Sequence, residues 1–131
     1  MRALIASRPA SLLLAATLLL AACGDASPSG SVACRAAVDG ELTITADNLA
    51  FDTACIALPA GETVTLILVN ADTDPHNVAI YTDSSKGTEL FAGDIVDGGE
   101  TVEYEVGPME AGTFYFDCTV HPTMSGSVVV E

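Results

Sequence analysis

The stretch "GTFYFDCTVHPTMSGSVVVE", residues 112–131, contains two β-strand candidates and, between them, three residues that can bind a metal ion. "GTFYFDC" and "GSVVVE" are rich in aromatic and β-branched residues and begin at a glycine, as short strands often do. Cys118, His121 and Met124 follow one another at steps of three, on a short loop that Pro122 stiffens. The stretch therefore predicts two strands whose connection carries a cysteine, a histidine and a methionine.

The rest of the chain after residue 30 shows the same strand-like pattern. "ELTITA" from Glu41 alternates apolar and polar residues, and "ETVTLILVN", Glu62–Asn70, is rich in β-branched residues after the turn signal "PAG". "HNVAIY", "GDIV" and "ETVEYEV" are further candidates, and most are bounded by Gly, Pro, Asn or Asp. Because no stretch here sustains a helical period, about eight short strands predict one all-β domain, an antiparallel sandwich or barrel.

Residues 1–22 are predicted to be an export signal rather than part of that domain. Arg2 and Arg8 give a positive start. The apolar run Ala10–Ala22 is about 13 residues long, which is too short to span a bilayer as a helix. A buried helix of a cytosolic domain is the alternative interpretation, but no charged residue interrupts the run to make a second face.

The end of this signal, "LAAC" at Leu20–Cys23, resembles the lipobox of bacterial lipoproteins. In that motif the cysteine is acylated after export and becomes the new N-terminus, so the resemblance implies a lipid on Cys23. Stable anchoring takes two or more acyl chains. An ordinary signal with an incidental cysteine is the alternative. The small and polar "GDASPSGS" that follows predicts a flexible tether over residues 23–33, before a folded domain over residues 34–131.

Beyond residue 22 the chain is strongly acidic. Only two basic residues remain, Arg35 and Lys86, against 18 acidic ones, which gives this part a net charge of −16. Such a surface repels phosphate backbones and anionic lipid headgroups. Nucleic acid is therefore excluded as a partner, and a lipid anchor has to hold without electrostatic help.

Three cysteines remain after Cys23 is assigned to the lipid. Cys34 and Cys55 flank the first strand, and in an oxidising compartment they favour a disulfide. The closed loop of about 22 residues stabilises the fold by about 3 kcal/mol in the chain-entropy model. Two free buried thiols are the alternative. Cys118 is left unpaired, and an odd thiol in an exported protein is an oxidation liability unless something occupies it.

A second histidine completes a candidate metal site. His76, in "DPHNVAIY", starts from a turn after Pro75 and leads into a strand over residues 77–81. If this strand lies beside the one that ends at Cys118, His76 meets Cys118 at one end of the sandwich. Two imidazoles, a thiolate and a weak axial thioether describe a blue-copper electron-transfer site. Zinc is the competing metal, although structural zinc sites are built from cysteine and histidine, without methionine.

The motifs "PHNV", "CTVHPTM" and "GSVVVE" resemble the cupredoxin family of type 1 blue copper proteins. The C-x-x-H-x-x-M spacing resembles that of amicyanin-like members, whereas plastocyanins carry a longer gap between histidine and methionine. The resemblance extends over residues 41–131 and implies an eight-stranded Greek-key β-sandwich that binds one copper ion. The ligands it implies are His76, Cys118, His121 and Met124.

The resemblance also implies a supporting residue beside these ligands. Asn77 is expected to tie the His76 loop to the cysteine loop by hydrogen bonds, which would fix ligand geometry. Three features depart from the family pattern, namely the Cys34/Cys55 pair, the loop "TDSSKGTEL" and the lipid anchor.

These observations predict a membrane-tethered one-electron carrier that cycles one copper between Cu(I) and Cu(II). Copper storage or delivery outside the cytoplasm is the alternative, and a copper enzyme is disfavoured because the site already uses both histidines of the chain. The expected partners are redox proteins with a basic docking surface, such as a cytochrome, an oxidase or a dehydrogenase. The expected location is a bacterial membrane, on its periplasmic or other extracytoplasmic side.

Overall fold

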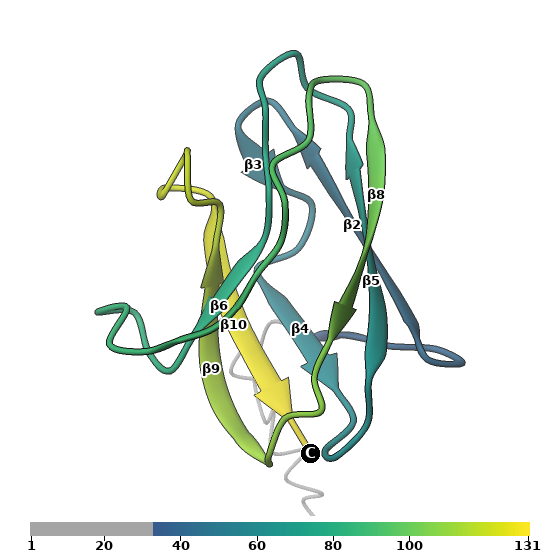
Figure 1. The fold of residues 1–131 in the computed structure, drawn as a ribbon, viewed down its shortest axis with the longest axis vertical. Coiled ribbons are helices and arrows are strands. Elements are labelled where there is room, and N and C mark those ends of the chain that lie inside the picture. The colour runs from purple at the N-terminus through teal and green to yellow at the C-terminus, as the bar shows by residue number, and fades with distance from the viewer. Residues whose placement is uncertain (1–32) are drawn as a thin grey trace, which may run out of the picture.

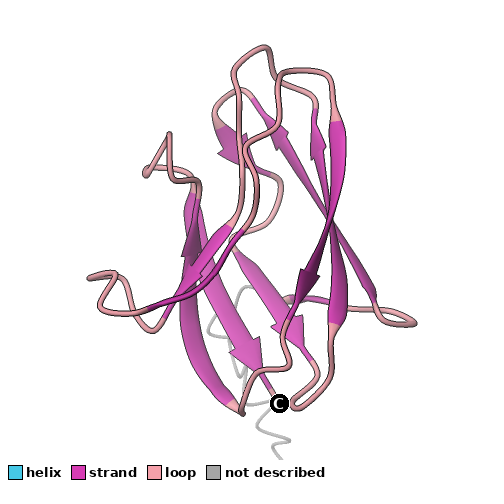
Figure 2. Ribbon diagram, in the orientation of Figure 1, coloured by secondary structure: helices cyan, strands magenta, loops and turns pink. Residues whose placement is uncertain are grey.

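The computed structural model describes residues 33–131, which fold into two β-sheets packed face to face (Figure 1). The predicted signal, the predicted acylation site Cys23 and most of the predicted tether lie outside the described residues. Within the described part the secondary structure consists of strands and loops, and no helix there could cross a membrane (Figure 2). The ten strands are β1 Arg35–Ala36, β2 Glu41–Asp47, β3 Ala50–Phe51, β4 Cys55–Leu58, β5 Val64–Asn70, β6 Ala79–Tyr81, β7 Glu89–Ala92, β8 Thr101–Val106, β9 Gly112–Asp117 and β10 Ser125–Val130.

The two sheets differ in size. One has six strands in the order β1-β4-β10-β9-β6-β7, and the other has four in the order β3-β2-β5-β8. Most neighbours are antiparallel, but β4 runs parallel to both β1 and β10, and β2 runs parallel to β5. The predicted all-β sandwich is confirmed, with ten strands rather than eight because β1 and β3 are additional two-residue pairings.

Burial alternates along β2, as the pattern of "ELTITA" predicted. The same alternation holds in β5, where every second residue is buried, from Val64 through Leu66 and Leu68 to Asn70. In β2, Leu42 and Ile44 point into the same core. Burying one such side chain stabilises the fold by about 1.5–3 kcal/mol relative to leaving it in water. The space between the sheets is therefore apolar, and its polar groups collect at the ends.

One strand prediction differs from the structure, and one strand, β7, was not predicted. The predicted strand "GDIV" is mostly irregular, with Val96 alone forming a bridge to His76. The reason is Tyr104, whose ring covers Gly93 so closely that an added Cβ would lie 2.5 Å from it, and whose hydroxyl donates to the carbonyl of Asp94 at 2.6 Å. The loop "TDSSKGTEL" instead leads into β7, which pairs with β6.

The sheet order places the predicted site residues at one end. The strand β6, which follows His76, pairs with β9, which ends one residue before Cys118, so the condition under which the sequence placed His76 beside Cys118 is met. The β9–β10 connection lies at the end of the sandwich away from the C-terminus (Figure 1). Loops from both sheets therefore meet where the metal-binding residues were expected.

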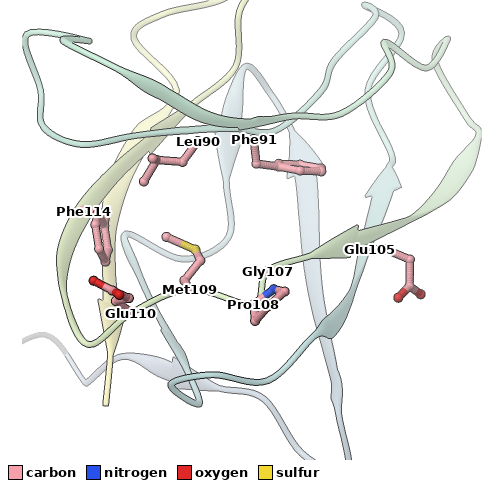
Figure 3. A pocket seen from close by; sticks show the side chains of 8 residues that line it. All are labelled: Leu90, Phe91, Glu105, Gly107, Pro108, Met109, Glu110 and Phe114. Carbon is pink, nitrogen blue, oxygen red and sulfur yellow. The ribbon is translucent and has the colours of Figure 1, made fainter.

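A hollow of about 360 Å³ lies elsewhere, where β7 and β8 face each other across the open side of the sandwich. Leu90, Phe91, Met109 and Phe114 provide its apolar lining, with Glu110 beside them (Figure 3). None of the candidate metal ligands lines it. It is therefore a feature of the sandwich edge and not of the candidate site.

The predicted disulfide between Cys34 and Cys55 is present and closes a loop with a sequence separation of 21. It joins the segment before β1 to the first residue of β4.

Replacing both cysteines, Cys34→Ala with Cys55→Ala, should lower the free energy of unfolding by about 3 kcal/mol, because the unfolded chain regains the freedom of that loop. Urea unfolding of the two forms measures the difference. Wild type with the disulfide reduced and Cys118 left unmodified serves as the control and should resemble the double variant. Equal stability of oxidised wild type and double variant would contradict this account.

Candidate metal centre

Cys118 comes to the site from the end of β9. The core-facing positions of this strand alternate, so Phe116 packs into the core and Cys118, two residues later, is also fully buried. Its backbone N–H donates to the carbonyl of Met124 at 3.0 Å, which closes the loop at the point where β10 begins. The thiol is the one free cysteine of the described residues.

The spacing of three between the candidate ligands follows from two successive turns. The N–H of His121 donates to the carbonyl of Cys118 at 3.3 Å, and the N–H of Met124 donates to the carbonyl of His121 at 2.9 Å. Bonds from residue i+3 back to residue i bring side chains three apart onto the same side of the chain. The loop thereby presents Cys118, His121 and Met124 together. Met124 is 2% exposed, and its role as a fourth donor stays a prediction.

His76 reaches the site from the other side of the loop cluster. Its backbone forms an isolated antiparallel β-bridge with Val96. The N–H of His76 donates to the carbonyl of Val96 at 3.0 Å, and the N–H of Val96 donates to the carbonyl of His76 at 2.9 Å. Its ring is fully buried, and its Nδ1 lies 3.7 Å from Cys118 Sγ and 3.2 Å from His121 Nδ1. The two imidazole centroids are 4.8 Å apart with their planes tilted by 59°.

These three donor atoms fit one shared metal ion. The sulfur and the two nitrogens all lie within 4.8 Å of one another, and His76 and Cys118 are buried while His121 is half-buried. Ligands held at about 2.0–2.3 Å from a first-row metal stand at such separations from each other. The two Nδ1 atoms are also close enough to share a proton or to bind one cation together. The donor set is soft sulfur with imidazole, which suits copper and zinc rather than calcium or magnesium.

Asp72 fixes the orientation of the His76 ring, and the sequence reasoning did not identify it. Its Oδ2 lies 3.2 Å from His76 Nε2 and accepts from the N–H of Leu49 at 2.8 Å, while its Oδ1 accepts from the N–H of Thr73 at 2.9 Å. The bonds from Leu49 and Thr73, together with that of His76, hold the pKa of Asp72 below its usual value. An ionised Asp72 accepts the proton on Nε2, which leaves the lone pair on Nδ1 for a metal.

Asn77 links the His76 segment to the cysteine loop. Its Oδ1 accepts from both the N–H and the hydroxyl of Thr119 at 2.9 Å, and its Nδ2 donates to the carbonyl of Gly93 at 2.9 Å. The side chain is 3% exposed, so these bonds are shielded from water. One amide thus holds three loop segments together beside the thiol.

A second buried amide does the same on the other sheet. Asn70, at the end of β5, donates from Nδ2 to the carbonyls of Asp74, Val96 and Asp97 at 2.8, 3.2 and 3.2 Å. From the sequence, Asn70 is identified only as the last residue of a predicted strand. The signal that could have identified it is a polar residue on the buried face of an otherwise apolar β5, where an unpaired amide would be costly.

Exposed apolar side chains lie at the end of the sandwich that carries the half-buried His121. Val120 precedes it and is 42% exposed. Leu49 and Ile95 are 48% and 52% exposed and belong to the same end, because Leu49 binds Asp72 and Ile95 adjoins the Val96 bridge. The end that carries the metal-binding residues therefore offers a water-exposed apolar rim, defined here by Leu49, Ile95 and Val120.

Comparison with known proteins identifies related chains. The family model described as a cupredoxin-like domain matches residues 10–130. Amicyanin of Paracoccus denitrificans is 33% identical over 93 residues, covering 71% of this chain and 67% of that protein. Amicyanin of Paracoccus versutus is 37% identical over 76 residues, covering 58% of this chain and 54% of the relative, so that match spans about half of the relative's length.

A solved structure shares the fold at lower identity. Auracyanin A of Chloroflexus aurantiacus, described as a "blue" copper protein, superposes with a TM-score of 0.61 at 23% identity, covering 70% of this chain and 98% of that one.

Proposed function

This chain belongs to the family of cupredoxin-like domains, and we propose that it is a one-electron carrier with a single copper ion held by His76, Cys118, His121 and Met124. The observation that carries the proposal is the convergence of two imidazole Nδ1 atoms and one thiol in a buried end of the sandwich. A bound copper ion supplies one-electron exchange between its Cu(I) and Cu(II) states. The protein residues supply the binding geometry, the exclusion of water and the path to the surface.

The ligand set serves both oxidation states of copper. The sulfur of Cys118 and the thioether of Met124 suit the softer Cu(I), and the two imidazoles suit Cu(II). The side chains are held by bonds that do not depend on the metal, from Asp72 to His76 and from Asn77 to Thr119. Because these bonds fix the donors in advance, few atoms have to move when an electron is gained or lost.

Burial favours a carrier over a delivery protein. His76 is 0% exposed and Cys118 is 0% exposed, so an acceptor protein cannot reach these donors without opening the loops. Only His121 reaches the surface, and its ring edge is the proposed point of electron exit. An enzyme is not supported, since the full sequence holds two histidines and both belong to this one site.

The surface around His121 indicates the kind of partner. The apolar rim of Leu49, Ile95 and Val120 can bury against another protein for a brief contact. Both cations of the described residues are already paired, Arg35 with Asp52 and Lys86 with Asp117. The remaining surface charge is therefore acidic, and it supports steering of a redox partner with a basic docking surface.

The proposed location is a bacterial membrane, on its periplasmic or other extracytoplasmic side. The disulfide supports an oxidising compartment outside the cytoplasm. The N-terminal signal pattern and the "LAAC" motif support export followed by lipid attachment at Cys23.

Replacing the thiol, Cys118→Ser, should abolish the intense blue colour of the Cu(II) form while the protein stays folded. The colour arises from charge transfer from thiolate sulfur to copper, and a hydroxyl oxygen has no comparable donor orbital. Absorption spectroscopy after copper addition measures it. The matched control is Cys34→Ser with Cys55→Ser, which removes two sulfurs outside the cluster and should keep the colour. A Cys118→Ser variant that stays blue would refute the ligand assignment.

Replacing the carboxylate that binds His76, Asp72→Asn, should weaken copper binding by about tenfold to a hundredfold and raise the reduction potential. A neutral amide no longer draws on the Nε2 proton, so Nδ1 becomes a weaker donor to Cu(II). Competition with a chelator and redox titration measure the two effects. The control is Asp74→Asn, an exposed carboxylate nearby whose side chain does not bind His76. Equal shifts in both variants would show a general charge effect instead.

Replacing the proposed acylation site, Cys23→Ser, should release the protein from membranes without changing its colour, since the predicted tether separates the anchor from the site. Membrane fractionation of cells expressing each form measures this. Sedimentation of the variant with membranes would contradict the lipid anchor and leave the copper assignment intact.

A further inference from the structure

A charged loop reaches back over the strand that carries Cys118. The segment 82–88 connects β6 to β7 and projects from the side of the sandwich (Figure 1). Thr82 and Thr88 close its base, where the N–H of Thr82 donates to the carbonyl of Thr88 at 2.9 Å. Inside it the side chain of Asp83 accepts from the N–H of Ser85 at 2.8 Å. The loop is therefore ordered by its own hydrogen bonds.

Lys86 occupies a strained position in this loop. Its φ is 59°, in the left-handed region that residues with a side chain seldom adopt. Its N–H donates to the carbonyl of Asp83 at 3.0 Å, which completes the turn. Glycine or asparagine would adopt this backbone more easily. A lysine at this position indicates that its side chain contributes something that the turn itself does not require.

The ammonium of Lys86 contacts the carboxylate of Asp117, the last residue of β9. Asp117 is 0% exposed, on the outer face of the six-stranded sheet, between Ala79 of β6 and Ser125 of β10. Because both neighbours are small, the side chain of Lys86 can reach the carboxylate of Asp117 across the outer face of the sheet. Among the described residues no hydrogen-bond donor of ordinary geometry satisfies the Asp117 oxygens, so this ion pair is their compensation.

The same ammonium lies 5.2 Å from the ring centroid of Tyr81, within the range of a cation–π contact. Tyr81 is 7% exposed and belongs to β6, the strand beside β9. The lysine is thus held by an aromatic face as well as by a carboxylate. Since it is the only lysine of the described residues, no second lysine there can substitute for it.

Asp117 directly precedes Cys118, so this ion pair adjoins the metal cluster. The carboxylate of Asp117 is shielded from water, whereas the side chain of Lys86 is 36% exposed. A buried charge acts over several ångströms more strongly than an exposed one. We propose that Lys86 is a positioning residue for the metal centre, which neutralises the buried carboxylate of Asp117 and thereby holds the end of β9 and sets the electrostatic potential at the Cys118 thiolate. This inference rests on the proposed copper site for its redox part only.

The sign of the electrostatic effect follows from charge. Removing the ammonium leaves an uncompensated negative charge one residue before Cys118, on the opposite face of the strand, which favours Cu(II) and lowers the reduction potential. Removing the carboxylate charge leaves the ammonium, which favours Cu(I) and raises the potential. Either change should alter the Cu(II)/Cu(I) equilibrium on the order of tenfold, because the charges are close and partly desolvated. When both charges are removed, the two shifts of the reduction potential should nearly cancel.

The experiment compares Lys86→Met, Asp117→Asn, the double variant and Lys86→Arg in full-length protein. Redox titration of the copper-loaded forms should give opposite shifts for the two single variants, near wild-type values for the double variant, and little change for Lys86→Arg. The matched control is Arg35→Met. Arg35 lies on β1 and pairs with Asp52, so this substitution also removes one positive charge from an ion pair. Shifts in the single variants no larger than that of Arg35→Met would overturn the electrostatic part.

A second measurement uses the metal-free protein. Urea unfolding of wild type, Lys86→Met, Asp117→Asn and the double variant should show that the two substitutions are coupled. The unfolding equilibrium constant of the double variant should be about tenfold smaller than the two single effects together would give. Additive effects would overturn the positioning role. If the protein bound no copper, the proposed function would fail while this coupling remained measurable. If it bound copper with unshifted potentials in the single variants, the function would stand and this inference would fail. Should Lys86→Met not fold, the isosteric Asp117→Asn still tests the predicted rise in potential.

Discussion

Two imidazole nitrogens that lie 3.2 Å apart, with a thiol sulfur 3.7 Å from one of them, have to share a proton or a cation, and this constraint governs the end of the sandwich where they meet. Buried polar atoms without partners are costly. The fold brings these atoms together regardless, through His76 from one loop and Cys118 and His121 from another. The structure thus maintains a preformed metal site, and the rigidity of the surrounding strands supports that arrangement.

The support comes from polar residues that each join separate loops. Asn70 binds the carbonyls of residues 74, 96 and 97, and Asn77 binds Gly93 and Thr119. Asp72 orients the His76 ring through its contact with Nε2, and the backbone N–H of Leu49 donates to Asp72 and holds it in place. These hydrogen bonds tie the loops of the site to one another. Such a network limits movement at the donors, which is what rapid one-electron exchange requires.

Much of this could be read from the sequence because it is encoded locally. The alternation in "ELTITA" predicted the buried face of β2, and the C-x-x-H-x-x-M spacing placed three metal-binding residues on one loop. The pairing of β6 with β9, which brings His76 to Cys118, entered only as a condition, because the pairing of strands depends on distant residues.

What escaped depends on contacts between distant residues. Asp72 acts through its distance to His76, and Lys86 reaches Asp117 across 31 positions of sequence only because a loop folds over β9. The irregular backbone at Gly93 likewise depends on the ring of Tyr104, and no local sequence pattern predicts that contact. The most direct test of the central claim is a titration of the metal-free wild-type protein with Cu(II), followed by absorption and electron paramagnetic resonance spectra and a redox titration. The account predicts one copper per chain, an intense thiolate-to-copper absorption with the spectrum of a type 1 site, and reversible one-electron reduction with the metal retained. A spectrum of an ordinary tetragonal Cu(II) site, or loss of the ion on reduction, would contradict it.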